Sequence, residues 1–186
     1  RVNFLLDIGQ LYARQSCITD TGFRWPWKVL DAGSNRIDRD FFNLEYYQRT
    51  DRILEFALKN DIFFGMEILY DNSLVRADEW SHHPLNVKNG GWLQDNEFGT
   101  GWGVMFDLHN EIHMKYMERY VRYTVARFSA FRNIVWAIGS EIGNLLTADE
   151  SSIENAKYPV KAAADWYNYW GQYIAGKDPH GRLRSL

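Results

Sequence analysis

The sequence predicts an α/β protein in which short buried strands alternate with longer helices. Three runs of residues are almost uninterrupted in apolar character, as expected of strands covered on both faces of a parallel sheet. Each run is followed, after a long connection, by a segment with a helical apolar stripe. The connections from each helix to the next strand are short. Together these observations indicate consecutive parallel β/α units.

The predicted strands lie at residues 2–8, 62–70 and 134–138, and a fourth begins near residues 183–186. Helices are predicted at 45–59 and 108–128, and a third from Pro159 to about residue 174, ending at Gly176. The first helix should bury Tyr46, Tyr47, Thr50, Leu54, Ala57 and Leu58. The second should bury Ile112, Met117, Tyr120, Val121, Thr124 and Phe128.

The connections from strand to helix are long, spanning residues 9–44, 71–106 and 139–158. Right-handed βαβ crossovers place the carboxyl ends of all parallel strands on one side, so these three segments should meet at one face. Connections of this length usually carry function. The active face is therefore expected at the carboxyl edge of the sheet.

This layout fits a (β/α)8 barrel or an open doubly wound sheet. No glycine-rich phosphate-binding motif follows any predicted strand, which disfavours the nucleotide-binding open sheet. A whole barrel needs about 250 residues and eight strands. We therefore expect residues 1–186 to form an incomplete TIM barrel that continues beyond both ends. The rest of the barrel, or another copy of the chain, would cover the open sheet edges.

Composition excludes several partners. The net charge of −3 and the lack of a basic run disfavour nucleic acid, and no apolar stretch is long enough to span a membrane. Cys17 is the only cysteine, so no internal disulfide or cysteine-rich zinc site is expected. No cofactor is required by any motif.

Glu141 is the sharpest candidate for catalysis. It follows the apolar strand predicted at 134–138 and the small residues Gly139 and Ser140, which would allow a turn at the rim. Barrel enzymes place acid and base groups just past the carboxyl ends of their strands. A structural role, as a helix cap or an arginine partner, is an equal alternative from the pattern alone.

Several short motifs, taken together in their order, resemble the cellulase-like (β/α)8 glycoside hydrolases of clan A. They are NLEYY at 43–47, HPLN at 83–86, NGG at 89–91, YVxYxxxRF at 120–128, NIVW at 133–136, and Ser140-Glu141. The resemblance extends from about Phe41 to the end of the chain. It implies a retaining glycosidase acting on a polysaccharide or oligosaccharide, and extracellular or periplasmic placement.

By this resemblance residues 133–138 are the fourth barrel strand and Glu141 is the general acid/base. Ser140 stands where the clan has an asparagine that binds the sugar 2-hydroxyl, which indicates a divergent subfamily. The clan's nucleophile follows the seventh strand, so it is not among these residues. A retaining mechanism needs two carboxyl groups about 5 to 5.5 Å apart, and this portion alone is therefore expected to be inactive.

Aromatic side chains in the long connections are candidates for sugar binding, because indole rings match the apolar faces of pyranoses. The substrate-binding candidates are Trp25, Trp27, Asp71, Trp80, His82, His83, Trp102 and Ser140, with Trp92 as a further ring. For any one ring, packing of the loops onto the barrel is the alternative. Trp136, Trp166 and Trp170 are expected in the core.

Other residues leave alternatives open. Asp7 and Glu67 lie within strands, and structural ion pairing is the favoured reading for both. His109 and His113 have the spacing of two metal ligands, but the segment reads HNEIH, so we expect surface histidines and no metal. A non-catalytic carbohydrate-binding barrel is the alternative to the enzyme.

Overall fold

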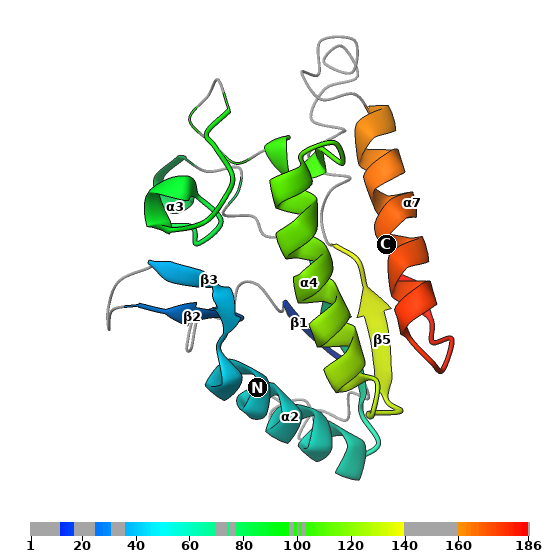
Figure 1. Cartoon of the computed structure of the whole chain (residues 1–186). Coiled ribbons are helices and arrows are strands. Elements are labelled where there is room, and N and C mark those ends of the chain that lie inside the picture. Colours follow the sequence, from blue (N-terminus) through cyan, green and yellow to red (C-terminus); the bar gives the residue numbers. More distant parts are fainter. Residues whose placement is uncertain are drawn as a thin grey trace.

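The computed structural model describes residues 12–16, 25–30, 36–69, 74, 77–96, 99, 101, 103–139 and 160–185. Its strands are β1 (Tyr12–Ser16), β2 (Trp27–Val29), β3 (Ile37–Phe42), β4 (Phe63–Glu67), β5 (Ile134–Ala137) and β6 (Arg184–Ser185). Its helices are α2 (Leu44–Lys59), α3 (Ala77–Ser81), α4 (Glu111–Phe128) and α7 (Val160–Lys177), with short 3₁₀ turns η2 (Val87–Asn89) and η3 (Val104–Phe106). Figure 1 shows their arrangement.

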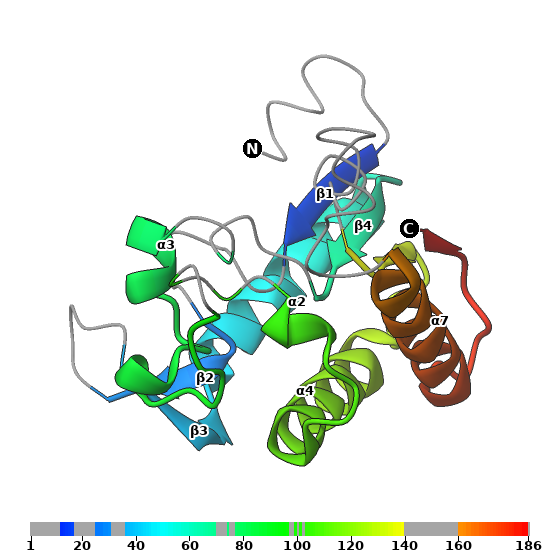
Figure 2. The ribbon, with the colours of Figure 1, turned by 90° about the horizontal axis from the view of Figure 1, so that it is seen from above.

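A parallel sheet of four strands forms the centre, in the order β1-β4-β5-β6. The strands are therefore neighbours in space in the order in which they follow along the chain. The long helices α2, α4 and α7 all lie on one side of this sheet (Figure 2). All three strand pairs of this sheet are parallel, and helices lie in the connections between them.

The main predicted elements are present. Strands predicted at 62–70 and 134–138 correspond to β4 and β5, and the start near 183 corresponds to β6. The three helices correspond to α2, α4 and α7, although α7 runs through Gly176 to Lys177. The strand predicted at residues 2–8 lies outside the described residues.

The connection predicted at residues 9–44 is not a plain loop. It contains β1, which pairs in parallel with β4, and the antiparallel pair β2 and β3. The segment YARQS of β1 is mostly polar, so it carries no apolar pattern that predicts a strand. Backbone pairing along β4, from Tyr12 beside Phe63 to Ser16 beside Glu67, defines it instead.

Asparagine caps begin the first two long helices. The Asn43 side chain accepts a hydrogen bond from the Tyr46 backbone N–H at 3.3 Å, and the Asn110 side chain accepts one from His113 at 3.0 Å. Most residues predicted to be buried on α2 and α4 are buried. Ile112 is an exception, because it is 57% exposed while the neighbouring His113 turns inward.

Polar contacts join α4 to both neighbouring helices. Arg127 pairs with Asp51 of α2 at 2.6 Å, and this interaction raises the pKa of the guanidinium. The Tyr47 and Thr124 hydroxyls lie 3.1 Å apart. On the other side, Tyr169 of α7 donates to the Glu118 carboxylate. The helices therefore form one continuous layer.

Several hydrogen bonds converge on the buried Asp178, just after the end of α7; we call this group of contacts the hub. Asp178 accepts hydrogen bonds from the Trp136 indole at 2.9 Å and from the Arg182 guanidinium at 2.5 Å. Trp136, Trp166 and Trp170 are all fully buried, which confirms their assignment to the core.

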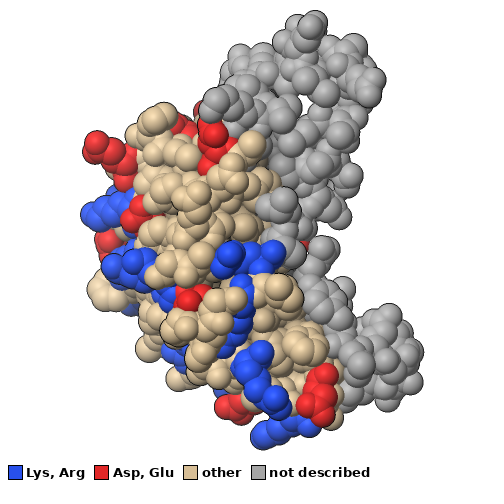
Figure 3. Space-filling model, turned by 90° about the vertical axis from the view of Figure 1, so that its right-hand side faces the viewer, with Lys and Arg blue, Asp and Glu red and all other residues tan. Residues whose placement is uncertain are grey.

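The outer surface around α7 carries lysine and arginine side chains interspersed with acidic ones (Figure 3). Among the described helices, none is long and apolar enough to cross a bilayer.

Candidate active site

The carboxyl edge of the sheet is defined by the ends of β4 and β5. Glu67, the last residue of β4, is paired with Ala137, the last residue of β5. Hydrogen bonds continue past both strands, from Ile68 N–H to the Ala137 carbonyl at 2.9 Å and from Leu69 N–H to the Ile138 carbonyl at 3.2 Å. The two strand ends are therefore held side by side up to the rim.

The predicted acid/base Glu141 and its neighbour Ser140 lie outside the described residues, as do Asp71 and Trp102. Gly139, two residues before Glu141, is the last described residue after β5. The roles predicted for these four residues stay predictions.

The two faces of the sheet can be told apart at this rim. Trp136 faces α7, because its indole reaches Asp178 at the end of that helix. Ile138 also faces α7, since a Cβ added at Gly171 would lie 3.4 Å from its side chain. Side chains alternate along a strand, so Ala137 faces the opposite side. Glu67 shares that side, because paired residues of parallel strands point the same way.

Glu67 therefore faces away from the helices, on the side that a closed barrel would enclose. Its side chain is only 6% exposed. Structural ion pairing was the favoured reading from the sequence, and it stays a prediction. Sequence alternation alone could not show its orientation, because that needed the register with β5.

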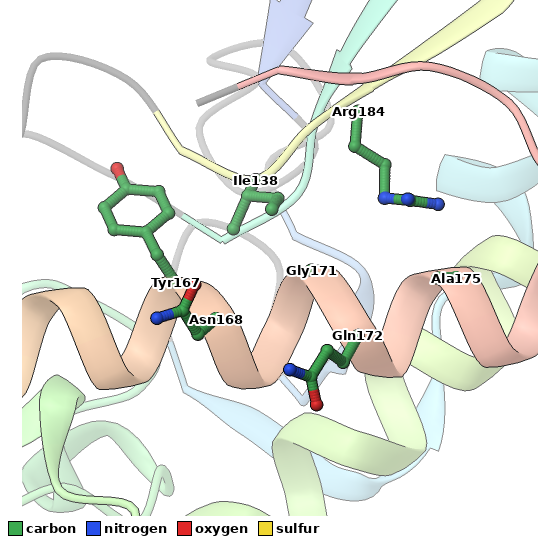
Figure 4. A pocket seen from close by; sticks show the side chains of 7 residues that line it. All are labelled: Ile138, Tyr167, Asn168, Gly171, Gln172, Ala175 and Arg184. Carbon is green, nitrogen blue, oxygen red and sulfur yellow. The ribbon is translucent and has the colours of Figure 1, made fainter.

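Tyr167 lies in the second turn of α7, next to this edge. Burial, followed by the negative charge of Glu67, raises the pKa of its phenol to about 12. Figure 4 shows its hydroxyl pointing away from the helix. Sequence analysis missed Tyr167, because its place beside Glu67 depends on how α7 packs against the sheet.

A cavity of about 270 Å³ lies between α7 and the strands β5 and β6 (Figure 4). Its lining comprises Ile138, Tyr167, Asn168, Gly171, Gln172, Ala175 and Arg184. Since Ile138 and Arg184 belong to the face turned toward α7, this cavity lies on the helix side of the sheet. It is separate from the face that carries Glu67.

Most of the described aromatic candidates pack against one another beside α4. Trp27 and Trp80 are 1% exposed, and the Trp80 ring is stacked on His83 at 5.4 Å between centroids. Trp25 is half-buried with its edge against His83, and His82 is exposed. In this conformation a sugar would reach Trp25 or His82 before Trp27 or Trp80.

Asp95 organises the segment that carries Trp80. It accepts from Lys88 at 2.6 Å, from the Trp80 indole at 2.9 Å and from Asn86 at 3.2 Å. These hydrogen bonds, led by that from Lys88, lower the pKa of the Asp95 carboxyl. The NGG motif has a steric role here, because a Cβ at Gly91 would lie 2.2 Å from the Leu85 backbone.

His113 is buried rather than on the surface, so that part of the sequence prediction is wrong. Its Nδ1 accepts from the Trp92 indole at 3.0 Å, and its Nε2 lies 3.0 Å from the Met105 carbonyl, to which it donates. Burial lowers its pKa to about 4. Both ring nitrogens are thus used by the protein, while His109 is exposed. Within the described part of the chain, no three potential ligands gather as a metal site requires.

Comparison with known proteins places the chain among the glycoside hydrolases. Residues 23–180 match the family described as "Apiosidase-like, catalytic domain". The chain therefore belongs to the apiosidase-like catalytic-domain family. No curated protein gives a significant match.

The fold is also similar to the crystal structure of a candidate glycoside hydrolase from Bacteroides vulgatus, with a TM-score of 0.56 and 16% sequence identity. The alignment covers 95% of this chain and 29% of that protein. The glycoside hydrolase level of the sequence resemblance is thus confirmed. Its finer assignment to the cellulase-like enzymes of clan A stays a prediction.

Proposed function

We propose that the complete protein is a retaining glycoside hydrolase that cleaves an O-glycosyl bond in a polysaccharide or oligosaccharide. The observation that carries this proposal is the family match over residues 23–180. The parallel sheet supports it, because barrel glycosidases work at the carboxyl ends of their strands. No cofactor is needed for this reaction.

In this proposal the chain is part of a (β/α)8 barrel. Four parallel strands in chain order, with helices on one side, are what consecutive barrel units would contribute. Further β/α units, or a second copy of the chain, would then cover the edges at β1 and β6.

Glu141 is proposed as the general acid/base. It follows Ala137, the last residue of β5, by four positions, and so belongs to the connection that leaves the carboxyl edge. Its carboxylic acid would protonate the leaving oxygen while a second carboxylate attacks the anomeric carbon. The negative charge of that second group, together with burial, would keep Glu141 protonated near neutral pH.

The family description suggests the first sugar to test, because it names an apiosidase-like domain. We propose a glycoside of apiose or of another small sugar as the substrate. The complete protein should therefore be screened on a glycan panel that includes apiose-containing oligosaccharides.

A covalent trap tests the retaining mechanism. The complete protein is incubated with an activated 2-deoxy-2-fluoro glycoside of the best substrate sugar and examined by mass spectrometry. The expected result is a mass increase of one fluoroglycosyl group. Turnover with inverted anomeric configuration and no adduct would reject retention, and binding without any turnover would favour a carbohydrate-binding protein.

A further inference from the structure

A buried carboxylate lies on the sheet face that none of the described helices covers. Glu67 ends β4, shares its face with Ala137 and keeps 6% of its surface exposed. Removing a carboxylate from water is costly unless its oxygens find partners. A carboxylate can accept about four hydrogen bonds, so it keeps capacity for a ligand in addition to contacts with protein.

Tyr167 approaches the same edge from the other side. It lines the same cavity as Ile138, the residue after Ala137, and its hydroxyl points away from α7 (Figure 4). The Glu67 carboxylate and the Tyr167 phenol thus lie near the adjoining ends of β4 and β5, on opposite faces of the sheet. Sugar hydroxyls donate hydrogen bonds, so the carboxylate suits one of them, and Tyr167 acts on this contact only through Glu67.

We infer that Glu67 is a substrate-binding residue that accepts a hydrogen bond from a ring hydroxyl of the sugar, with Tyr167 as a positioning residue beside it. The small exposed fraction of Glu67 suits contact with one hydroxyl rather than with a whole ring. This inference rests on the proposed glycosidase function and assigns a subsite within it. Hydrogen bonds to a charged acceptor in a shielded site are stronger than those to neutral acceptors.

Glu67→Gln in the complete protein tests the contact. Gln keeps the shape of the side chain but removes its charge, so kcat/KM should fall by about 10- to 100-fold. Tyr167→Phe should lower it by a smaller factor. Glu118→Gln and Tyr173→Phe are matched controls, because both side chains lie at the contact between α4 and α7. The controls should change kcat/KM by less than about threefold.

Deoxy sugars separate substrate contact from a structural role. Wild type and Glu67→Gln are compared on the monodeoxy analogues of the best substrate, one for each ring position. For one analogue, kcat/KM of the wild type should fall relative to the parent sugar. For Glu67→Gln, replacing the parent sugar by the same analogue should cause no further fall. The inference would be overturned if wild type and Glu67→Gln lost kcat/KM equally on every analogue. It would also be overturned if the folded variant kept the wild-type kcat/KM on the parent sugar. If Glu67→Gln does not fold, Glu67→Asp is used in the same comparison.

Binding measurements keep this inference distinct from the proposed function. If the wild-type protein hydrolyses no glycan, calorimetric titration with free monosaccharides, apiose included, still compares it with Glu67→Gln. If the wild type binds a sugar and Glu67→Gln binds it more weakly, the contact at Glu67 is supported and the hydrolase function is rejected. No sugar binding by the wild type would overturn both.

Discussion

At the scale of single residues, one imidazole ties a long connection to a helix. His113 accepts from Trp92 and donates to the Met105 carbonyl, which lie on the chain segment leading into α4. The Trp92 ring also stacks on Tyr116 at 4.9 Å, and its edge meets Trp27 at 5.3 Å. A neutral His113 is therefore required, because protonated Nδ1 could not accept from the indole.

This requirement makes stability depend on pH. The pKa of His113 is about 4 in the folded protein and 6.5 as the unperturbed value, lowered by burial and opposed by the Met105 carbonyl and the negative charge of Asp107. Between these values the unfolded chain binds a proton that the folded chain does not. The contribution of His113 to the free energy of unfolding should therefore be fully present above pH 6.5. The free energy of unfolding should fall by on the order of 3 kcal/mol as the pH drops from 6.5 to 4.

Urea unfolding of the complete protein at pH 7.5 and pH 5 measures this effect. His113→Gln should be less stable at pH 7.5 and show a smaller change between the two conditions. His109→Gln is the control, because His109 is exposed and should leave the pH dependence unchanged. An equal loss on acidification in wild type and His113→Gln would contradict the account.

The burial of His113 shows what a helical pattern can and cannot predict. The stripe on α4 was predicted well, but His113 and Ile112 were exchanged between inside and outside. Hydrophobicity favours isoleucine inside, and only the partners of the imidazole reverse this preference. Those partners come from the segment before α4, and their positions cannot be derived from periodicity.

At the scale of elements, the hub at Asp178 fixes the end of α7 to β5. Burial alone would raise the pKa of Asp178, but hydrogen bonds from Trp136 and from the His180 and Arg182 backbone, with the Arg182 charge, lower it overall. The Arg182 guanidinium also donates to the Ser129 carbonyl at the end of α4. One carboxylate therefore joins two helices and a strand.

Asp178→Asn should destabilise the protein by about 2 to 4 kcal/mol, because it leaves the partly buried Arg182 without its counter-charge. The free energy of unfolding from urea titration measures this loss. Glu55→Gln, at an exposed position of α2, is the control and should change stability by less than about 0.5 kcal/mol. A loss no larger than that of the control would show that the hub contributes little.

Elements differ in how well the sequence predicts them. The strands β4 and β5 are apolar and buried on the helix side, so their pattern predicts them directly. β1 is polar, and the short strands β2 and β3 form a hairpin inside a long connection. These three depend on pairing partners that no local pattern identifies.

At the scale of the whole molecule, the parallel order of the strands puts the proposed active site at their carboxyl ends. The strands β4 and β5 end together, and the residues that follow β5 lead to Glu141. The position of Glu141 after an apolar strand could be predicted from the sequence. The pairing of Glu67 with Ala137 could not, because it joins residues 70 positions apart.

Turnover by Glu141→Gln in the complete protein tests the central proposal most directly. A natural glycan has a poor leaving group, so in this proposal its cleavage needs a proton from Glu141. The account predicts a fall in kcat of about 10²- to 10⁴-fold, with folding and sugar binding retained. Wild-type turnover by the folded Glu141→Gln variant would contradict it.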